Sequence, residues 1–264
     1  MTRRIRVGGV AMGGGAPVSI QSMTNTDTRD AEATLAQIRA LARAGCDLVR
    51  VSVYDAACAK AMRSLVDGSP VPLIADIHFD ADLAVASVEQ GIAKLRINPG
   101  NIGGAQAVRR VADCAKAHGV PIRVGVNAGS LDKKLLNRYG RPTPEALVES
   151  ALEHARLLED CQFTDIVLAV KTSSVRDTVA SYRLAAQRCD YPLHIGVTEA
   201  GLPEDGLIKS AVALGALLLD GIGDTLRVSL SGDPLEEPKA AQKILRAAGI
   251  LRDRPEIIAC PTCG

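Results

Sequence analysis

The sequence predicts an α/β protein with the fold of a (β/α)8 TIM barrel, preceded by a short N-terminal hairpin. Eight short apolar runs, mostly rich in Val and Ile, alternate with segments whose apolar residues recur at helical spacing. The runs start near residues 18, 48, 72, 94, 121, 165, 192 and 225, which are 30, 24, 22, 27, 44, 27 and 33 residues apart. Each interval holds one strand and one helix, and 264 residues is close to the length usual for a closed barrel. No Gly-x-Gly-x-x-Gly motif follows the first strand, which argues against a dinucleotide-binding sheet.

The elements are expected in the following order. A glycine-rich stretch at residues 4–15 is typical of a short hairpin. Strands are expected at residues 17–21, 48–53, 72–78, 94–98, 121–127, 165–171, 192–198 and 225–231. Between them, Val108, Val111 and Ala115 show helical spacing, and Thr143 before Pro144 supplies an N-cap and a first-turn proline. The longest interval contains an extra segment, residues 128–140, which a barrel would place on its catalytic face.

Composition narrows the possible classes of protein. Hydrophobic residues make up 47% of the chain, and the net charge of +1 gives no bulk reason to expect nucleic-acid or membrane binding. No strictly apolar run is longer than the five residues 166–170, and no apolar segment follows the N-terminus, so we expect no membrane span or signal and a cytoplasmic location. Seven cysteines without an export signal argue against a disulfide framework. Only Cys260 and Cys263 form a Cys-x-x-Cys motif.

Four strands repeat one plan, in which an apolar residue is followed by Arg, a β-branched residue, and a small or polar residue. Side chains alternate between the two faces of a strand, so the arginines of these strands share one face. They are Arg50, Arg96, Arg123 and Arg227. One Arg in a strand is usually an edge residue or half of an ion pair, but four in the same pattern favour a common site.

The strand ends that form the barrel mouth collect more cations than acids. Five cations, Arg50, Arg96, Arg123, Lys171 and Arg227, are expected there with two acids, Asp76 and Glu199. An unpaired cation in a low-dielectric cavity is costly, so an anionic ligand should match the excess. Converging guanidinium groups suit phosphate oxygens and favour a diphosphate.

Histidines and glycines near the mouth carry weaker signals. His78 stands at the end of a strand, where it is placed for ligand contact or proton transfer. His194 comes early in its strand and is interpreted as structural. Gly100, Gly103 and Gly104 offer backbone N–H groups to a phosphate, a weak indication by itself.

Seven motifs together resemble one known family, the 4-hydroxy-3-methylbut-2-enyl diphosphate synthases, iron-sulfur enzymes of the methylerythritol phosphate route to isoprenoids. They are QSMTNT at 21–26, ADIHFD at 75–80, LRINPGNIG at 95–103, GVNAGSL at 125–131, TEAG at 198–201, GIGDTLRVS at 221–229 and CPTC at 260–263. They occur in family order through the whole chain. The resemblance implies reductive ring opening and dehydroxylation of 2-C-methyl-D-erythritol 2,4-cyclodiphosphate to (E)-4-hydroxy-3-methylbut-2-enyl diphosphate.

The resemblance also implies roles for individual residues. Glu199, beside Thr198, would be the acid that helps the hydroxyl leave as water, and His78 is grouped with them as catalytic. Arg227 would support the residues that hold the diphosphate. The substrate-binding set is Arg50, Asp76, His78, Arg96, Asn98, Arg123, Asn127, Lys171, Arg227 and Ser229.

The cofactor implied is a [4Fe-4S] cluster, to which Cys260 and Cys263 would supply two thiolates. Such a cluster takes four ligands, and the others are expected beyond residue 264. We therefore expect residues 1–258 to form the substrate-binding barrel and 259–264 to begin a truncated iron-sulfur domain. The chain alone is expected to bind the cyclic diphosphate without turnover.

The implied partners are flavodoxin or ferredoxin as electron donor and a second copy of the chain in a homodimer. Two alternatives stay open. One is an enzyme similar to dihydropteroate synthase, whose barrel would bind a pterin and need no Cys-x-x-Cys. The other is a phosphate-binding barrel that recruits a cluster-bearing partner in trans.

Overall fold

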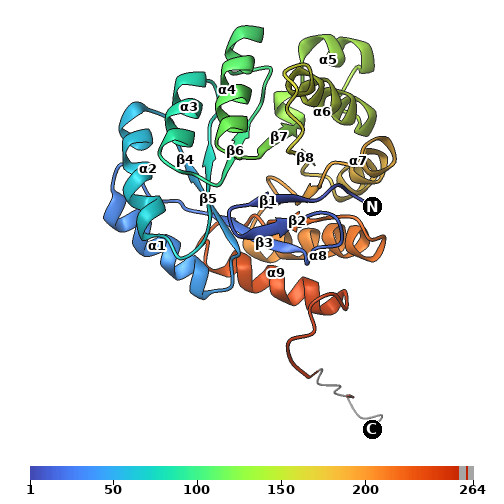
Figure 1. Ribbon diagram of the computed structural model, residues 1–264. Helices are drawn as coiled ribbons and strands as arrows, with labels where there is room; N and C mark the ends of the chain where they lie inside the picture. The colour runs from blue at the N-terminus through green and yellow to red at the C-terminus, as the bar shows by residue number, and fades with distance from the viewer. Residues whose placement is uncertain (256–259, 261–264) are drawn as a thin grey trace.

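The computed structural model describes residues 1–255 and 260, and its centre is a ring of eight parallel strands enclosed by helices (Figure 1). The ring strands are β3 (Ser19–Met23), β4 (Leu48–Ser52), β5 (Leu73–Asp76), β6 (Lys94–Ile97), β7 (Ile122–Asn127), β8 (Ile166–Lys171), β9 (His194–Ile195) and β10 (Thr225–Leu226). Their order is β8-β7-β6-β5-β4-β3-β10-β9, and a parallel bridge between Leu168 and Leu193 joins β8 to β9. The predicted TIM barrel is confirmed.

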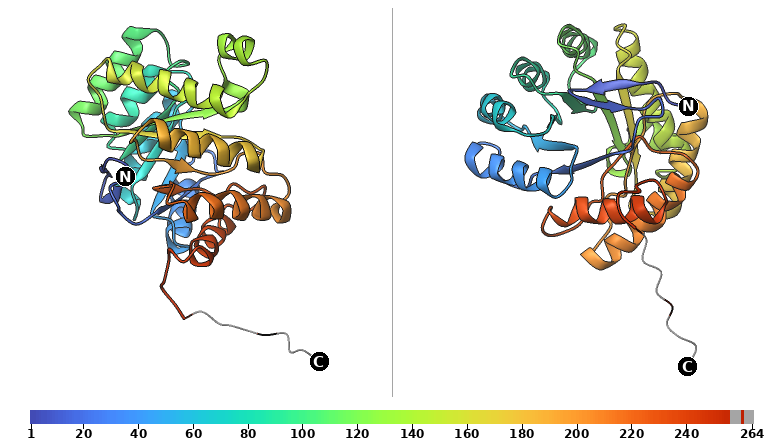
Figure 2. Two further views of the ribbon diagram at one scale, coloured as in Figure 1. Left: turned by 90° about the vertical axis from the view of Figure 1, so that its right-hand side faces the viewer. Right: turned by 60° about the horizontal axis from the view of Figure 1, so that its bottom comes forward.

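The helices alternate with the strands and cover the outside of the ring (Figures 1 and 2). They are α1 (Ala31–Arg43), α2 (Ala56–Gly68), α3 (Ala81–Glu89), α4 (Ala105–Ala117), α6 (Pro144–Glu159), α7 (Val175–Arg188), α8 (Pro203–Leu219) and α9 (Glu236–Ala247). Most begin after a side chain that accepts a backbone N–H of the first turn, and such a cap contributes about 0.5–2 kcal/mol. Among these caps are Asp30, Asp55, Asp80 and the expected Thr143.

The two additional segments predicted from the sequence are also present. Strands β1 (Ile5–Val7) and β2 (Val10–Met12) pair as an antiparallel hairpin. The hairpin buries Ile5, Val7 and Met12 against inward-facing Leu48 and Ile74, so it closes the amino-terminal end of the barrel. The segment after β7 forms a short 3-10 turn, η1 (Ala128–Ser130), and helix α5 (Lys133–Tyr139).

Strand alternation separates two environments inside the fold. In β6, Leu95 and Ile97 are fully buried in the apolar layer between strands and helices. Lys94 and Arg96 occupy the alternate positions and face the interior of the ring. The barrel interior is thus apolar under the hairpin and polar toward the carboxyl ends of the strands.

Two expected strands are shorter than predicted. The run at residues 192–198 contributes only β9, and the run at 225–231 only β10. The amide of Arg227 still donates to the carbonyl oxygen of Ile195 at 3.1 Å, after which the chain leaves the sheet for the mouth. The expected division near residue 259 falls among residues outside the described part of the chain and stays a prediction. In the described residues no helix is both long and apolar enough to cross a bilayer.

Candidate functional site

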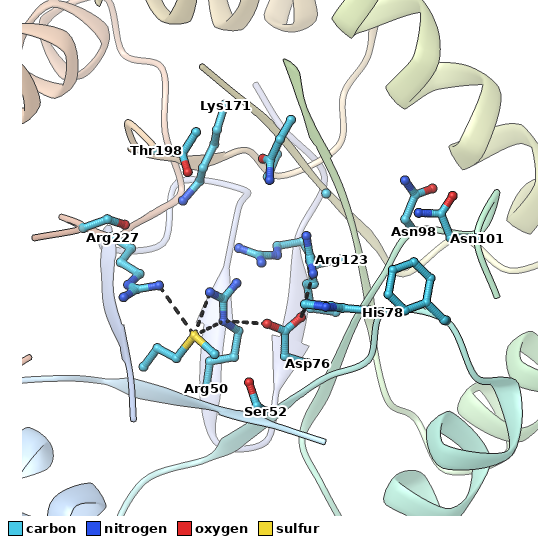
Figure 3. Close-up of a pocket in the computed structure, with 17 residues that line it drawn as sticks. Arg50, Ser52, Asp76, His78, Asn98, Asn101, Arg123, Lys171, Thr198 and Arg227 are labelled. Atoms are coloured by element: carbon cyan, nitrogen blue, oxygen red, sulfur yellow. Dashed lines mark hydrogen bonds and ion pairs between the residues drawn. The ribbon is translucent and has the colours of Figure 1, made fainter. Parts of the chain in front are cut away.

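A cavity of about 420 Å³ opens at the carboxyl ends of the barrel strands (Figure 3). All residues predicted to bind substrate line it, namely Arg50, Asp76, His78, Arg96, Asn98, Arg123, Asn127, Lys171, Arg227 and Ser229, and so does Thr198. Met23, Ser52, Phe79, Asn101, Gly125 and Ala169 complete the lining. Residues from all eight ring strands or their following loops therefore meet at one site, because the barrel brings all strand ends to one rim.

Asp76 is the central carboxylate of the site. Its Oδ1 accepts from Arg96 Nη1 at 2.8 Å and lies 3.4 Å from His78 Nε2, and its Oδ2 lies 3.5 Å from Arg50 Nε. Burial by itself would raise the pKa of Asp76, but Arg50, His78 and Arg96 hold that pKa well below its ordinary value. Asp76 is therefore a carboxylate that orients two guanidinium groups rather than a proton donor.

Arg50 and Arg227 come together at the sulfur of Met23 (Figure 3). Arg50 Nη2 lies 2.9 Å and Arg227 Nη1 3.7 Å from Met23 Sδ. Burial lowers the pKa of Arg50 to about 10, since the charge of Asp76 offsets the desolvation only in part. A soft thioether between two guanidinium groups satisfies one N–H without adding negative charge.

The carboxylate that pairs with Arg227 is Glu237, which the sequence reasoning missed. Glu237 Oε1 and Oε2 accept from Arg227 Nη2 and Nε, each at 2.9 Å. The expected second acid of the mouth, Glu199, is exposed and lies outside the residues that line the cavity. The carboxylates that pair with the cations are therefore Asp76 and Glu237 rather than Asp76 and Glu199, while the role given to Glu199 stays a prediction.

Arg123 and Lys171 reach the cavity without a paired carboxylate in the part of the chain that the structure describes. Arg123 is 2% exposed, and its Nε and Nη1 have no hydrogen-bond partner among the described residues. Lys171 Nζ lies 3.2 Å from Nε2 of His194. Burial, followed by the neighbouring cations Arg123 and Arg50, lowers the pKa of Lys171 well below its ordinary value.

Two further buried groups lie below the cavity. Lys94 is fully buried, and its Nζ has no hydrogen-bond partner in the described part of the chain. His194 is also fully buried, and burial together with Lys171, Arg123 and Lys94 lowers its pKa well below the ordinary value. His194 does not line the cavity, in keeping with its place early in the strand, but its contact with Lys171 connects it to the site.

Glycines make room for the cations. A Cβ atom at Gly125 would lie 3.1 Å from Arg96 Nε. A Cβ atom at Gly196 would lie 2.7 Å from both Lys171 Nζ and the carbonyl oxygen of Arg227. The absence of a side chain at Gly196 lets Lys171 Nζ lie against the backbone just after β9.

The residues expected to act in chemistry are placed differently from the binding set. Thr198 lines the cavity, whereas Glu199 is exposed and has a φ of 52°, in the left-handed region that L residues rarely occupy. Cys260 is exposed and free, and Cys263 lies outside the described residues. No group of three or more His, Cys, Asp or Glu in the described ranges is arranged to hold a metal ion. The described residues do not by themselves form a cluster site.

Comparison with known proteins identifies close relatives. The sequence matches the family described as the GcpE TIM-barrel domain over residues 2–242. A protein from Lawsonia intracellularis and one from Geobacter sulfurreducens are each 58% identical to the chain over 263 residues. Both are named 4-hydroxy-3-methylbut-2-en-1-yl diphosphate synthase (flavodoxin), and the alignments cover 100% of this chain and 73% and 74% of those proteins.

Solved structures with the same architecture are more distant. The spore coat polysaccharide biosynthesis protein spsE from Bacillus subtilis matches with a TM-score of 0.66 at 14% identity, covering 96% of this chain and 76% of that one. Dihydropteroate synthase from Xanthomonas albilineans matches with a TM-score of 0.62 at 16% identity, covering 94% and 99%. At these identities the likeness shows the barrel fold alone.

Proposed function

The chain belongs to the GcpE family of TIM-barrel domains, and from this premise we propose that it is the substrate-binding barrel of a 4-hydroxy-3-methylbut-2-en-1-yl diphosphate synthase. The reaction is the reductive ring opening and dehydroxylation of 2-C-methyl-D-erythritol 2,4-cyclodiphosphate, and the enzyme is an oxidoreductase. Relatives carry flavodoxin in their names, which supports flavodoxin as the electron donor. The cytoplasmic location stays a prediction.

The observation that carries the proposal is the surplus of cations around the cavity. Six cationic side chains are gathered in and just below it, Arg50, Lys94, Arg96, Arg123, Lys171 and Arg227. Within the described residues the only carboxylates paired with them are Asp76 and Glu237. A ligand with two phosphate groups would supply the missing negative charge, since phosphate oxygens accept charge-assisted hydrogen bonds from guanidinium and ammonium groups.

The proposed roles follow from position. Arg123 and Lys171 supply donors that no carboxylate among the described residues neutralises, and Arg50 and Arg96, oriented by Asp76, complete the cationic wall. His78, Asn98, Asn127 and Ser229 add polar contacts at the rim. Glu199 is the proposed proton donor to the leaving hydroxyl, next to Thr198 in the loop that follows β9. The [4Fe-4S] cluster remains part of the proposal, with Cys260 and Cys263 among its ligands.

A homodimer is also part of the proposal, and the outer face of α8 supports it. Ile208, Val212 and Leu219 are 63%, 57% and 75% exposed, and Leu202 just before the helix is 72% exposed. Ile208, Val212 and Leu219 follow helical spacing and form one apolar stripe. Exposed apolar stripes of this kind mark association surfaces, so we place the second copy against α8.

Isothermal titration calorimetry with 2-C-methyl-D-erythritol 2,4-cyclodiphosphate tests the assignment of the substrate. We expect Arg123→Ala and Lys171→Ala each to weaken binding by about 1.5–3 kcal/mol, because each removes a charge-assisted contact. Arg109→Ala and Lys116→Ala are matched controls, since both side chains are exposed on α4. Unchanged binding in both cavity variants, or preferential binding of a pterin, would contradict the proposal.

A further inference from the structure

The carboxylate of Glu237 lies behind the cavity wall, in the first turn of α9, and is only 2% exposed. Besides its two bonds with Arg227, its Oε2 accepts from the hydroxyl of Ser22 at 2.6 Å. Its Oε1 accepts from the backbone N–H of Leu230 at 3.3 Å. One buried carboxylate therefore connects α9 to β3 and to the segment that follows β10.

The contacts of Glu237 hold the chain after β10, where the hydrogen bonds of the sheet end. β10 stops at Leu226, but Arg227 and Ser229, two residues of the cavity lining, come after it. In this segment the backbone N–H of Arg227 donates to the carbonyl oxygen of Ile195, and the backbone N–H of Leu230 donates to the side chain of Glu237. Glu237 thus binds both ends of the segment 227–230, through the guanidinium of Arg227 and the backbone N–H of Leu230. Arg227 and Ser229 of this segment line the cavity.

The same contacts orient the guanidinium of Arg227. Its Nε and Nη2 are engaged by Glu237, and its Nη1 lies toward Met23 and Arg50 in Figure 3. Arg227 lines the cavity, and its Nη1 is the guanidinium nitrogen that Glu237 does not engage. The negative charge of Glu237 also offsets the repulsion between the two guanidinium groups that meet at Met23.

From this geometry we propose that Glu237 is a positioning residue of the substrate site, which holds Arg227 and Ser229 in place for the diphosphate without touching it. The inference rests on the proposed function, because it takes the cyclic diphosphate as the ligand. It goes beyond that function by assigning a role to a helix residue outside the cavity lining.

A double-mutant cycle on ligand affinity tests the proposal. The dissociation constant of 2-C-methyl-D-erythritol 2,4-cyclodiphosphate is measured for wild type, Glu237→Gln, Arg227→Ala and the double variant. We expect Glu237→Gln to weaken binding roughly tenfold or more in the wild-type background, since a buried charge pair is broken. In the Arg227→Ala background the same change should cost only about twofold, because Arg227 is gone and only the contact with the segment that carries Ser229 remains.

Controls separate positioning from a general loss of structure. Glu236→Gln removes the adjacent, exposed carboxylate, which pairs with Lys239, and should leave affinity unchanged. Should Glu237→Gln fail to fold, Glu237→Asp withdraws the carboxylate by one methylene and Ser22→Ala removes one of its donors, and both should weaken binding while thermal unfolding remains cooperative. Equal losses in both backgrounds of the cycle would overturn the proposal.

The failure of this inference can be distinguished from failure of the proposed function. Wild-type chain that does not bind the cyclic diphosphate would contradict the proposed function. The cycle is then measured with inorganic pyrophosphate, which also needs Arg227 in place. Wild-type binding of either ligand with no effect of Glu237→Gln or Glu237→Asp would overturn the positioning role alone.

Discussion

The ammonium of Lys171 lies 3.2 Å from Nε2 of His194, deep in the barrel and directly below the cavity. Burial and the neighbouring Lys171 lower the pKa of His194 well below its ordinary value, and a neutral ring protonated at Nδ1 offers its Nε2 as an acceptor to Lys171 Nζ. The backbone carbonyl oxygen of His194 accepts from the hydroxyl of Tyr182 at 2.6 Å, which fixes the backbone at this position. A neutral acceptor thus orients Lys171, which has no paired carboxylate among the described residues.

Replacing His194 by Phe should weaken binding of the cyclic diphosphate about tenfold, because Lys171 loses the acceptor that orients it. His194→Gln, which keeps an acceptor oxygen, should lose less. Calorimetry gives the affinities, and His118→Gln on the exposed end of α4 is the control. Full affinity in His194→Phe would show that Lys171 is oriented by other groups.

Because the pKa of buried Lys171 is lowered, we expect the chain to take up protons when it binds the ligand. The pKa of Lys171 is lowered by burial and by Arg123, and a bound phosphate would raise it again. Titrations in two buffers of different ionisation enthalpy, repeated over a series of pH values, measure the uptake. Lys171→Met should take up fewer protons than wild type, whereas Lys116→Met should not differ from it. Binding enthalpies that are independent of buffer at every pH would contradict this prediction.

The same lowered pKa values determine how stability depends on pH. Lys94 and Lys171 bind fewer protons in the folded chain than in the unfolded chain, whose lysines titrate at their ordinary value of 10.5. The free energy of unfolding of the ligand-free chain should therefore rise with pH between the lowered pKa values and 10.5. Urea denaturation of wild type and Lys94→Met over this range measures the slope, which should be smaller in the variant.

Gly196→Ala should weaken both folding and binding. Its Cβ atom would lie 2.7 Å from Lys171 Nζ and from the carbonyl oxygen of Arg227, and the latter cannot move without disturbing the backbone. We expect a loss of about 1–3 kcal/mol in the free energy of unfolding, with a weaker affinity for the cyclic diphosphate. Gly9→Ala is the control, because a Cβ atom there meets nothing within 4 Å. Equal stability of the two variants would show that the chain near Gly196 relaxes freely.

Much of the site could be predicted because its residues lie on strands. Alternation of side chains places Arg50, Arg96 and Arg123 on one face from the sequence alone, and the same rule would have found Lys94, two residues before Arg96. Glu237 could not be found in this way, since an acid in the first turn of a helix is common and needs no partner. His194 was missed because the sequence does not reveal that the long side chain of Lys171 turns down toward it.

Because the backbone at Glu199 is strained, a substitution that relieves the strain should raise stability and lower activity. A φ of 52° costs an L residue about 1 kcal/mol, and Gly avoids most of that cost. Glu199→Gly should therefore raise the free energy of unfolding by roughly 0.5–1 kcal/mol, whereas Glu204→Gly in the first turn of α8 should lower it. In an enzyme assay with the complete cofactor, both Glu199→Gly and Glu199→Gln should lose turnover. Turnover that survives in both would remove Glu199 from the chemistry.

The apolar stripe on α8 predicts which substitution separates two copies of the chain. Val212 is at its centre, between Ile208 and Leu219, and a carboxylate at this position would be buried without a partner in a dimer. We expect Val212→Glu to reduce the molar mass in solution from about two chains to one while the thermal unfolding of the barrel is retained, because Val212 is exposed in the single chain. Sedimentation equilibrium measures the mass, and Ala117→Glu on α4 introduces the same charge at an exposed site away from α8. A Val212→Glu variant that associates as strongly as wild type would place the contact on another face of the barrel.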